Sequence, residues 1–372
     1  MSNSNIFMKH KIAIVGSKGI PASYGGYETF AEEISAELVH AGHDVVVVGE
    51  FRNENDVSST LGVEVLFSKY IKSKNPIMYY HDSIQKAVAV NCSKIIVCGV
   101  GGVFSAFLFQ RKVDIYVNPD GLGFRRSKWS KLKRKALYFQ YWFCARYVDK
   151  IIADSLAIAK YFESKFDRNK GVYVAEYGAR LPKTTLHEDR NNLTRYGLHK
   201  NSYAICVARI EPENNIDLIL DGFVEYSRDY NDSLILVIVG NTNTKYAKEI
   251  ILKYEKSESI RFIGGIYDKS ILKTLRESAA IAFHGHSVGG TNPSLLEAML
   301  SKVPIIAHDN DFNREVLDDK GYFFRNKKEI VESLNKRQNS SFSEYCEHYK
   351  NRVLSHYSWQ EIARKYSEIL SK

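Results

Sequence analysis

One arginine near the middle of the chain stands where an apolar run gives way to a polar turn. Arg209 directly follows the run Tyr203–Ala208 and precedes Glu211-Pro212-Glu213-Asn214-Asn215. A guanidinium at the carboxyl end of a strand, beside the start of a helix, suits phosphate recognition because its donors form a rigid fork. The commoner alternative for a single arginine is an exposed ion pair, so the neighbouring segments have to decide between the two.

A second segment, residues 284–299, reads His-Gly-His-Ser-Val-Gly-Gly-Thr-Asn-Pro-Ser-Leu-Leu-Glu-Ala-Met and follows another apolar run. Glycines followed by a proline in the first helical turn build a helix N-terminus that favours an anion. Glu297 lies one turn inside this predicted helix, where its carboxylate can accept hydrogen bonds from ribose hydroxyls or be solvated. Gly265, which follows a further strand, lets a flat base approach the backbone. The residues that we expect to bind a phosphate-bearing ligand here are His286, Gly290, Thr291, Asn292 and Pro293.

The first half of the sequence has a glycine-rich loop of its own, Gly16–Glu28. It is about twice as long as the dinucleotide fingerprint G-x-G-x-x-G and does not match it. Gly25 and Gly26 stand at a predicted helix N-terminus, where an anion is favoured, although a turn that needs positive φ explains them equally well. Asp120, in the segment Asn118-Pro119-Asp120-Gly121, is either a catalytic carboxylate or a turn residue.

The elements that must position these residues alternate between strand and helix in both halves. A polar stretch, Pro182–Asn201, separates the halves. Short runs rich in Val and Ile are apolar on both faces, as buried parallel strands are. We predict two doubly wound parallel-sheet α/β domains that face each other across a cleft, with ligands outside the carboxyl ends of the strands. The predicted strands are residues 11–17, 44–50, 63–68, 94–100, 114–118, 150–153, 172–176, 203–208, 234–239, 261–263, 279–283 and 303–307.

Composition limits the class of protein. The 372 residues are 44% hydrophobic and 26% charged, which suits two ordered globular domains. No run of about 18 uncharged apolar residues occurs, and no signal-peptide core is present at the start. The five cysteines are odd in number and never spaced C-x-x-C. We therefore expect a cytoplasmic protein with reduced thiols and no zinc site.

The net charge of +9 is concentrated in one segment. Residues 121–150 hold nine Lys or Arg and a single acid, interleaved with aromatic residues. A helix of this composition can lie in an anionic membrane interface, and the alternative is a packed aromatic face with solvated cations. No nucleic-acid-binding module accompanies the patch, so we expect no nucleic-acid partner. The predicted membrane surface consists of Lys128, Trp129, Lys131, Lys133, Arg134 and Lys135.

Together these segments resemble the GT-B glycosyltransferases of family 4, which are retaining enzymes that use nucleotide sugars. The resemblance rests on the pairing of Arg209-x-Glu-Pro-Glu-Asn with Gly-Gly-Thr-Asn-Pro-Ser-Leu-Leu-Glu-Ala-Met. Residues 19–30, Gly-Ile-Pro-Ala-Ser-Tyr-Gly-Gly-Tyr-Glu-Thr-Phe, and the segment Asn118–Leu122 with Lys128-Trp129 after it resemble the rhamnosyltransferase subgroup of bacterial rhamnan and capsule synthesis.

The resemblance implies a GT-B fold with three parts. Residues 1–180 form a Rossmann-like acceptor-binding domain and residues 181–355 a Rossmann-like domain that binds the nucleotide-sugar donor. Residues 356–372 form a helix that packs back toward the N-terminal domain. The implied reaction transfers a sugar to a lipid-linked saccharide at the cytoplasmic face of the membrane. The leading candidate for this sugar is L-rhamnose, with TDP-rhamnose as its donor. A UDP- or GDP-hexose donor stays open.

The resemblance also assigns residues. Arg209 and Asp120 are the implied catalytic residues, and the resemblance implies neither a cofactor nor a metal. The donor site gains Gly25, Gly26, Arg209 and Asn214. The implied acceptor-binding residues are Tyr24, Tyr27, Glu28, Asp120, Arg125 and Arg126.

Two positions depart from the family pattern. The lysine expected five residues after the arginine is Asn214, and the first acid of the usual E-x7-E pair is Gly289. A missing lysine removes a charge-assisted contact of about 1.5–3 kcal/mol, unless another cation, for example Lys18, replaces it. Loss of the acid is compatible with a 6-deoxy sugar. Two other classes stay open: a nicotinamide oxidoreductase, which needs the fingerprint that this chain lacks, and a polyanion-binding protein, which rests on the charge patch alone.

Overall fold

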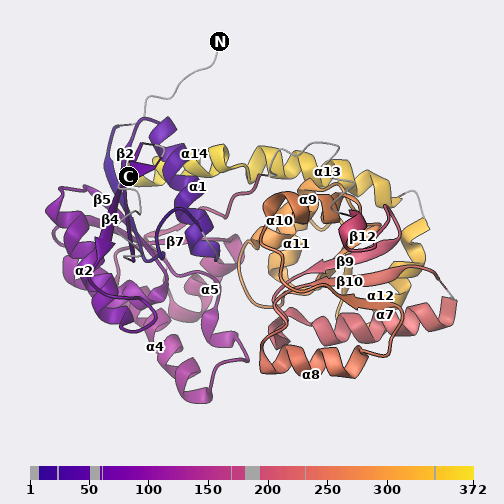
Figure 1. The fold of residues 1–372 in the computed structure, drawn as a ribbon. Coiled ribbons are helices and arrows are strands. Elements are labelled where there is room, and N and C mark those ends of the chain that lie inside the picture. Colours follow the sequence, from indigo (N-terminus) through magenta and orange to yellow (C-terminus); the bar gives the residue numbers. More distant parts are fainter. Residues whose placement is uncertain are drawn as a thin grey trace, which may run out of the picture. The chain divides into compact units, whose positions relative to one another are not determined.

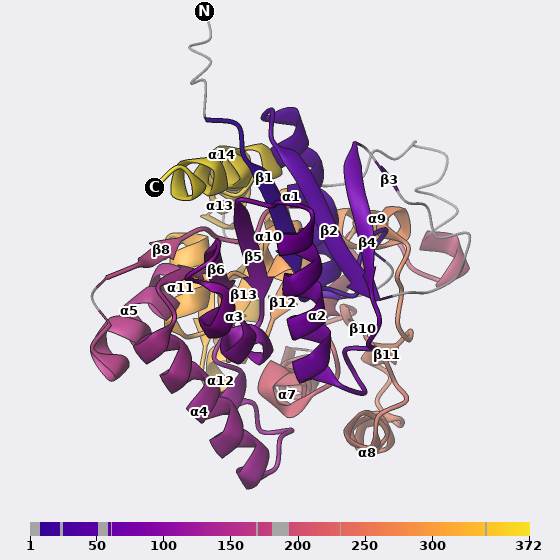
Figure 2. The ribbon, with the colours of Figure 1, turned by 90° about the vertical axis from the view of Figure 1, so that its left-hand side faces the viewer.

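The structure is a computed structural model that describes residues 8–22, 25–50, 59–60, 62–168, 170–180, 193–230, 232–338 and 341–372. The chain divides into two compact units, each built on one sheet (Figures 1 and 2). The first unit comprises Met1–Arg125, Ser130–Gly178 and Ser358–Lys372. The second comprises Arg126–Trp129 and Ala179–Tyr357.

The first sheet has eight strands in the order β3-β4-β2-β1-β5-β6-β7-β8. All pairs are parallel except the edge pair of β3 with β4. The central strand β1 is buried on both faces, which is why its sequence is a continuous apolar run and does not alternate. The strands are β1 (Lys11–Val15), β2 (Asp44–Glu50), β3 (Ser59–Thr60), β4 (Val63–Ser68), β5 (Lys94–Cys98), β6 (Asp114–Asn118), β7 (Lys150–Ala153) and β8 (Val172–Val174).

Helices of the first unit begin where side chains satisfy their unpaired N–H groups. Asn75, Ser130 and Ser155 each accept a hydrogen bond from the first turn of the helix that follows. The helical elements are α1 (Gly26–His40), α2 (Pro76–Ala89), η1 (Val100–Gly102), α3 (Val103–Phe109), η2 (Gly123–Arg125), α4 (Lys131–Tyr147), α5 (Leu156–Phe166) and α14 (Trp359–Leu370).

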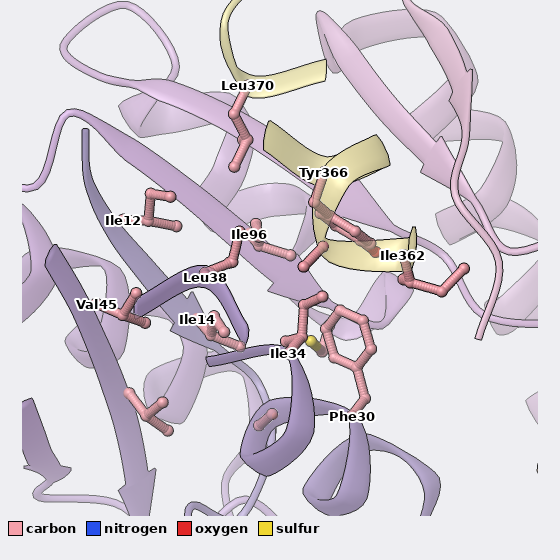
Figure 3. Close-up of a cluster of buried hydrophobic side chains, with 14 of the residues drawn as sticks. Ile12, Ile14, Phe30, Ile34, Leu38, Val45, Ile96, Ile362, Tyr366 and Leu370 are labelled. Carbon is pink, nitrogen blue, oxygen red and sulfur yellow. The ribbon is translucent and has the colours of Figure 1, made fainter. Parts of the chain in front are cut away.

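The last helix of the chain, α14, completes the core of the first unit. Ile362 and Tyr366 join Phe30 of α1 in one buried cluster over Ile12 and Ile14 (Figure 3). The rings of Phe30 and Tyr366 are 5.5 Å apart. Without α14, this face of the sheet would expose its apolar side chains to water. The final segment therefore belongs to the first unit, although the second unit separates it in the sequence from the rest of that unit.

The second sheet is fully parallel, in the order β11-β10-β9-β12-β13-β14. Tyr203 and Ile205 of β9 belong to one apolar cluster, whereas Ala204 and Cys206 belong to another. Because neighbouring residues of a strand point to opposite faces, the sheet has a core on each side. The strands are β9 (Tyr203–Val207), β10 (Ile235–Val239), β11 (Ile260–Phe262), β12 (Ile281–His284), β13 (Ile305–His308) and β14 (Tyr322–Phe324).

The helices of the second unit are η3 (Pro212–Asn214), α7 (Ile216–Tyr230), α8 (Lys245–Tyr254), α9 (Lys269–Glu277), α10 (Pro293–Leu300), α11 (Asp311–Leu317), α12 (Lys327–Asn335), η4 (Lys336–Gln338) and α13 (Ser341–His356). Most of them lie between these strands in the sequence, and α12, η4 and α13 follow the last strand. The predicted pair of doubly wound, parallel-sheet α/β domains is thereby confirmed. Strands β3 and β14 are additions that the sequence pattern did not indicate. None of the described helices is both long enough and apolar enough to cross a bilayer.

Replacement of a buried α14 side chain tests how much the first unit depends on this helix. Ile362 is fully buried, so Ile362→Ala should lower the free energy of unfolding by about 2–5 kcal/mol. Ile77 in α2 is 57% exposed, so the matched variant Ile77→Ala should change it by less than about 0.5 kcal/mol. Urea denaturation followed by tryptophan fluorescence measures both. Equal effects would mean that α14 is not part of this core.

Candidate active site

Two loops meet at the carboxyl edge of the second sheet. Strands β9 and β12 are parallel neighbours, so the loops that follow them emerge at the same edge. The Asn215 Nδ2 group donates to the Gly285 carbonyl at 2.7 Å, and the Ser294 hydroxyl donates to the Val207 carbonyl at 2.8 Å. The structure thus brings the Arg209 loop and the glycine-rich loop together, as the sequence led us to expect.

The loop that carries Arg209 is held by a hydrogen bond from Asn214 and by close packing against Gly285. The Arg209 side chain is 44% exposed, and its Nη1 lies 3.7 Å from Oε2 of Glu211. The Asn214 Nδ2 group donates to the Arg209 carbonyl at 2.7 Å. A Cβ atom at position 285 would come within 2.1 Å of the Asn214 carbonyl oxygen, so the tight approach requires Gly285. Asn214 is 2% exposed, and its side chain fixes the backbone of the arginine.

A short segment from the first half of the sequence belongs to the second unit. Arg126–Trp129, between η2 and α4, packs with the Arg209 loop. The Lys128 Nζ atom lies 3.0 and 3.1 Å from the two carboxylate oxygens of Glu211, and the Ser127 hydroxyl lies 3.3 Å from Oε2 of Glu213. The Lys128 side chain is only 22% exposed, so this lysine is an ion-pair partner at the site. The sequence analysis placed Lys128 in the predicted membrane surface, and the structure pairs its ammonium with Glu211.

The helix N-terminus after the glycine-rich loop is capped by its own residues. Oδ1 of Asn292 accepts the N–H of Ser294, and the Asn292 carbonyl accepts the N–H groups of Leu295 and Leu296. Pro293 has no N–H. The first turn of α10 therefore offers few donors to a ligand, and an anion here would be bound by the backbone of the preceding Gly289–Thr291 segment.

Two stacked histidines lie beside this loop. The rings of His284 and His286 are 4.4 Å apart and nearly parallel. Burial lowers the pKa of His286 to about 3, and the charges of Arg209 and Arg126 contribute to the same shift. Burial likewise lowers the pKa of His284 well below its ordinary value. Both imidazoles are therefore neutral near pH 7 and add no positive charge to the site.

Glu297 makes a contact that its sequence position did not reveal. Its Oε2 lies 2.7 Å from Nη2 of Arg276, which is almost completely buried at the end of α9. A buried guanidinium needs a carboxylate partner, so this pairing fixes the orientation of Glu297. Further along the same sheet edge, a Cβ atom at Gly265 would lie 3.0 Å from the hydroxyl of Tyr267, an exposed aromatic residue. The sequence analysis identified neither Arg276 nor Tyr267.

The glycine-rich loop of the first unit is held by a buried carboxylate. Oε1 of Glu28 accepts the Lys18 N–H at 2.9 Å. A Cβ atom at Gly25, where φ is +121°, would lie 2.1 Å from Oε2 of the same side chain. Glu28 thus braces the loop, and Gly25 is required both by φ and by space. Gly26 begins α1, and Tyr24 lies outside the described residues.

A half-buried lysine forms the centre of a polar cluster in the first unit. The Nζ atom of Lys72 donates to the Gly16 carbonyl and lies 5.4 Å from the ring of Tyr27 and 5.5 Å from that of Tyr80. Burial lowers the pKa of Lys72. The groups whose charges oppose this shift are Cys98, Glu28, Asp120 and Glu50. The sequence analysis missed Lys72 because no local motif surrounds it.

Asp120 lies in the same neighbourhood. It adopts a left-handed conformation with φ +64°, and its N–H donates to Oδ1 of Asn118 at 2.9 Å. The Tyr27 hydroxyl donates to the Asn118 carbonyl at 3.3 Å. The pKa of Tyr27 is raised well above its ordinary value, first by burial and then by the charge of Asp120. Asp120 is thus a turn residue, and it lies in one polar cluster with Lys72 and with Tyr27 of α1.

Some of the remaining basic residues contact an aromatic ring or a backbone carbonyl, and others are exposed to solvent. The Arg125 guanidinium lies 4.9 Å over the ring of Tyr161, and Nε of Arg134 donates to the Phe124 carbonyl at 2.9 Å. The Lys128 Nζ atom also lies 5.2 Å from the ring of Trp129. Lys131, Lys133 and Lys135 are exposed at the start of α4. In the part of the chain that the structure describes, no three His, Cys, Asp or Glu side chains form a group that would hold a metal ion.

Comparison with known proteins finds matches for each half of the chain. Residues 190–356 match the family model described as Glycosyl transferases group 1. Residues 8–180 match a separate model, described as a domain of unknown function (DUF1972). An uncharacterized glycosyltransferase of Methanocaldococcus jannaschii is 23% identical over 73% of this chain and 71% of its own length.

Solved structures agree on the fold. The sucrose-phosphate synthase of Thermosynechococcus elongatus superposes with a TM-score of 0.78 at 13% identity, covering 97% of this chain and 98% of that one. Anabaena HepE in complex with UDP and glucose superposes with a TM-score of 0.72 at 14% identity, covering 97% and 99%. At such identities the likeness shows the fold, and the predicted GT-B fold is confirmed.

The neutral state of His286 predicts a pH dependence of stability. The unfolded chain binds a proton at this residue near pH 6.5, whereas the folded protein does so only near pH 3. Stability present above pH 6.5 is therefore lost as the pH falls toward 3. His286→Asn should flatten the decline in melting temperature between pH 7 and pH 5, whereas replacement of the exposed His199 by Asn should not. Identical slopes for wild type and His286→Asn would show that the imidazole titrates normally.

Proposed function

We propose that the protein is a retaining, metal-independent glycosyltransferase that moves a sugar from a nucleoside diphosphate sugar to a lipid-linked saccharide. One observation carries the proposal. Arg209 stands at the carboxyl end of β9, beside the Gly289–Pro293 loop, within a glycosyl transferases group 1 domain. This arrangement offers positive charge and backbone donors at the place where ligands bind in parallel α/β sheets.

The chemistry follows from where charge develops. As the bond between the sugar and the diphosphate breaks, negative charge grows on the leaving phosphate oxygens. The guanidinium of Arg209 and the N–H groups of Gly289–Thr291 stabilise this charge without reorganisation, because the loop contacts already fix them. The acceptor hydroxyl attacks the anomeric carbon from the same face that the diphosphate leaves, so the anomeric configuration is retained. An oxygen of the departing diphosphate takes the proton of this hydroxyl.

The acceptor is proposed to bind to the first unit. Asp120, Tyr27 and Lys72 form a polar cluster at the carboxyl ends of its strands, which suits sugar hydroxyls. Asp120 orients the acceptor hydroxyl or assists its deprotonation. Glu28 supports the cluster by bracing the loop, and Arg125 supplies positive charge on the segment after Asp120.

The donor is proposed to be TDP-rhamnose. Gly289 stands where the family pattern has an acid that contacts donor hydroxyls, and a 6-deoxy sugar needs fewer such contacts. Glu297, held by Arg276, is oriented to accept hydrogen bonds from the ribose. The alternative donor is a UDP- or GDP-hexose, and the HepE structure with UDP and glucose favours testing UDP-glucose first among these.

The proposed location is the inner membrane surface. Lys131, Lys133 and Lys135 surround Leu132, which is 79% exposed, at the start of α4. Further along the helix, Phe139 is 51% exposed and stacks on Trp142. Cations beside exposed aromatic and aliphatic side chains suit an anionic lipid interface, where a lipid-linked acceptor is found.

Arg209→Ala tests the donor site. Loss of a guanidinium that stabilises the leaving group should reduce kcat by about 100- to 1000-fold. Arg228→Ala is the matched control, because Arg228 is 73% exposed and pairs with its neighbour Asp229 on α7. Transfer is measured across TDP-rhamnose, UDP-glucose and GDP-mannose, with and without excess EDTA. Activity of Arg209→Ala within threefold of wild type would remove the arginine from the site, and activity that needs Mg²⁺ or Mn²⁺ would refute metal independence.

A triple variant tests the membrane surface. Changing Lys131, Lys133 and Lys135 to Gln should reduce sedimentation with anionic vesicles, because each cation contributes about 1 kcal/mol. The control changes three exposed lysines of the second unit, Lys245, Lys248 and Lys328. Added salt should mimic the first variant through screening over about 8–10 Å, while nucleotide binding stays unchanged. Undiminished sedimentation of the first variant would show that these lysines are merely solvated.

A further inference from the structure

Three basic side chains of the second unit gather around the Arg209 loop. Lys128 contacts both oxygens of Glu211, at 3.0 and 3.1 Å, and Arg209 approaches the same carboxylate at 3.7 Å. The Glu211 carboxylate therefore holds Lys128 and Arg209 on the same small patch. Arg126 precedes them on the segment that the Ser127–Glu213 contact anchors.

Positive charge exceeds negative charge in this cluster. Two of the cations, Lys128 and Arg209, share the single carboxylate of Glu211. The Lys128 and Arg209 side chains are 22% and 44% exposed, so both retain surface for a further partner. Oε1 of Glu213 and Nδ1 of His286 are buried atoms for which the described residues provide no hydrogen-bond partner. One carboxylate offsets only one of these two positive charges, so the cluster is suited to a ligand that carries several phosphate oxygens.

We propose that Lys128 is the second cation of the diphosphate site and takes the role that the family pattern gives to a lysine at position 214. Asn214 is buried and bonded to the Arg209 carbonyl, so it does not supply that charge. The Lys128 ammonium has three donors and can keep Glu211 while giving another to a phosphate oxygen. Arg126, two residues before Lys128 in the sequence, adds a further guanidinium. This inference rests on the proposed function, since it names the residue that binds the donor diphosphate.

The position of Lys128 in the sequence has a consequence for the reaction. The same connection between β6 and α4 carries Asp120, assigned to the acceptor, and Lys128. A donor diphosphate that binds Lys128 fixes the end of this connection.

The test compares ligands with and without the diphosphate. Calorimetric titration of the wild-type protein with TDP, UDP, thymidine and uridine comes first, and absence of any nucleoside diphosphate binding would overturn the proposed function itself. Given binding, Lys128→Gln should weaken the affinity for the preferred diphosphate about tenfold, the loss of one charge-assisted hydrogen bond. Affinity for the nucleoside should stay within twofold, and Lys128→Arg should restore most of the loss.

Two further variants keep the outcome decisive. Lys131→Gln removes an exposed lysine three residues away and should leave both affinities unchanged. Arg126→Gln should reproduce the selective loss if Lys128→Gln proves too unstable for titration, as judged by circular dichroism. Diphosphate affinity unchanged in folded Lys128→Gln, or equal losses for diphosphate and nucleoside, would overturn the inference and reduce the Lys128–Glu211 pair to a structural contact, while the proposed function would stand.

Discussion

The arrangement of the second-unit site depends on one carboxylate. Glu211 accepts from Lys128 and lies beside Arg209, so it compensates two cations that would otherwise repel each other. This carboxylate can do so because the loop beneath it is fixed by the Asn214 amide and by the close approach that Gly285 permits. The result is a concentrated positive charge whose geometry exists before any ligand arrives, and such preorganisation is what stabilises a leaving diphosphate.

The fold was predictable because burial on both faces leaves a strong pattern in the sequence. Strands such as β1, β2 and β9 are continuous apolar runs, and the helices α2, α4 and α5 begin at capping side chains. β14 was missed because its three residues, Tyr322–Phe324, are aromatic and lack the Val and Ile that marked the other strands. The two-sheet architecture was thus recoverable from local sequence, whereas the pairing of long-range side chains was not.

The candidate site shows where local reasoning ends. The meeting of the Arg209 loop and the glycine-rich loop could be predicted, because both follow neighbouring parallel strands. Lys72, Arg276 and the pairing of Lys128 with Glu211 could not, because each contact joins residues far apart in the sequence. Glu28 and Asn214 illustrate a second limit. Tight loops leave backbone groups without partners, and the nearest polar side chain forms hydrogen bonds with them. A polar residue within a motif therefore often stabilises the loop itself.

The central claim is that this chain binds a nucleoside diphosphate through its phosphates. Phosphorus NMR of TDP and UDP during titration with the protein tests it most directly. The account predicts that both phosphorus resonances of the preferred nucleotide shift or broaden with saturation, because cations contact the two phosphates, while those of NAD stay unchanged. Unchanged resonances of TDP and UDP at a large excess of protein would contradict the account.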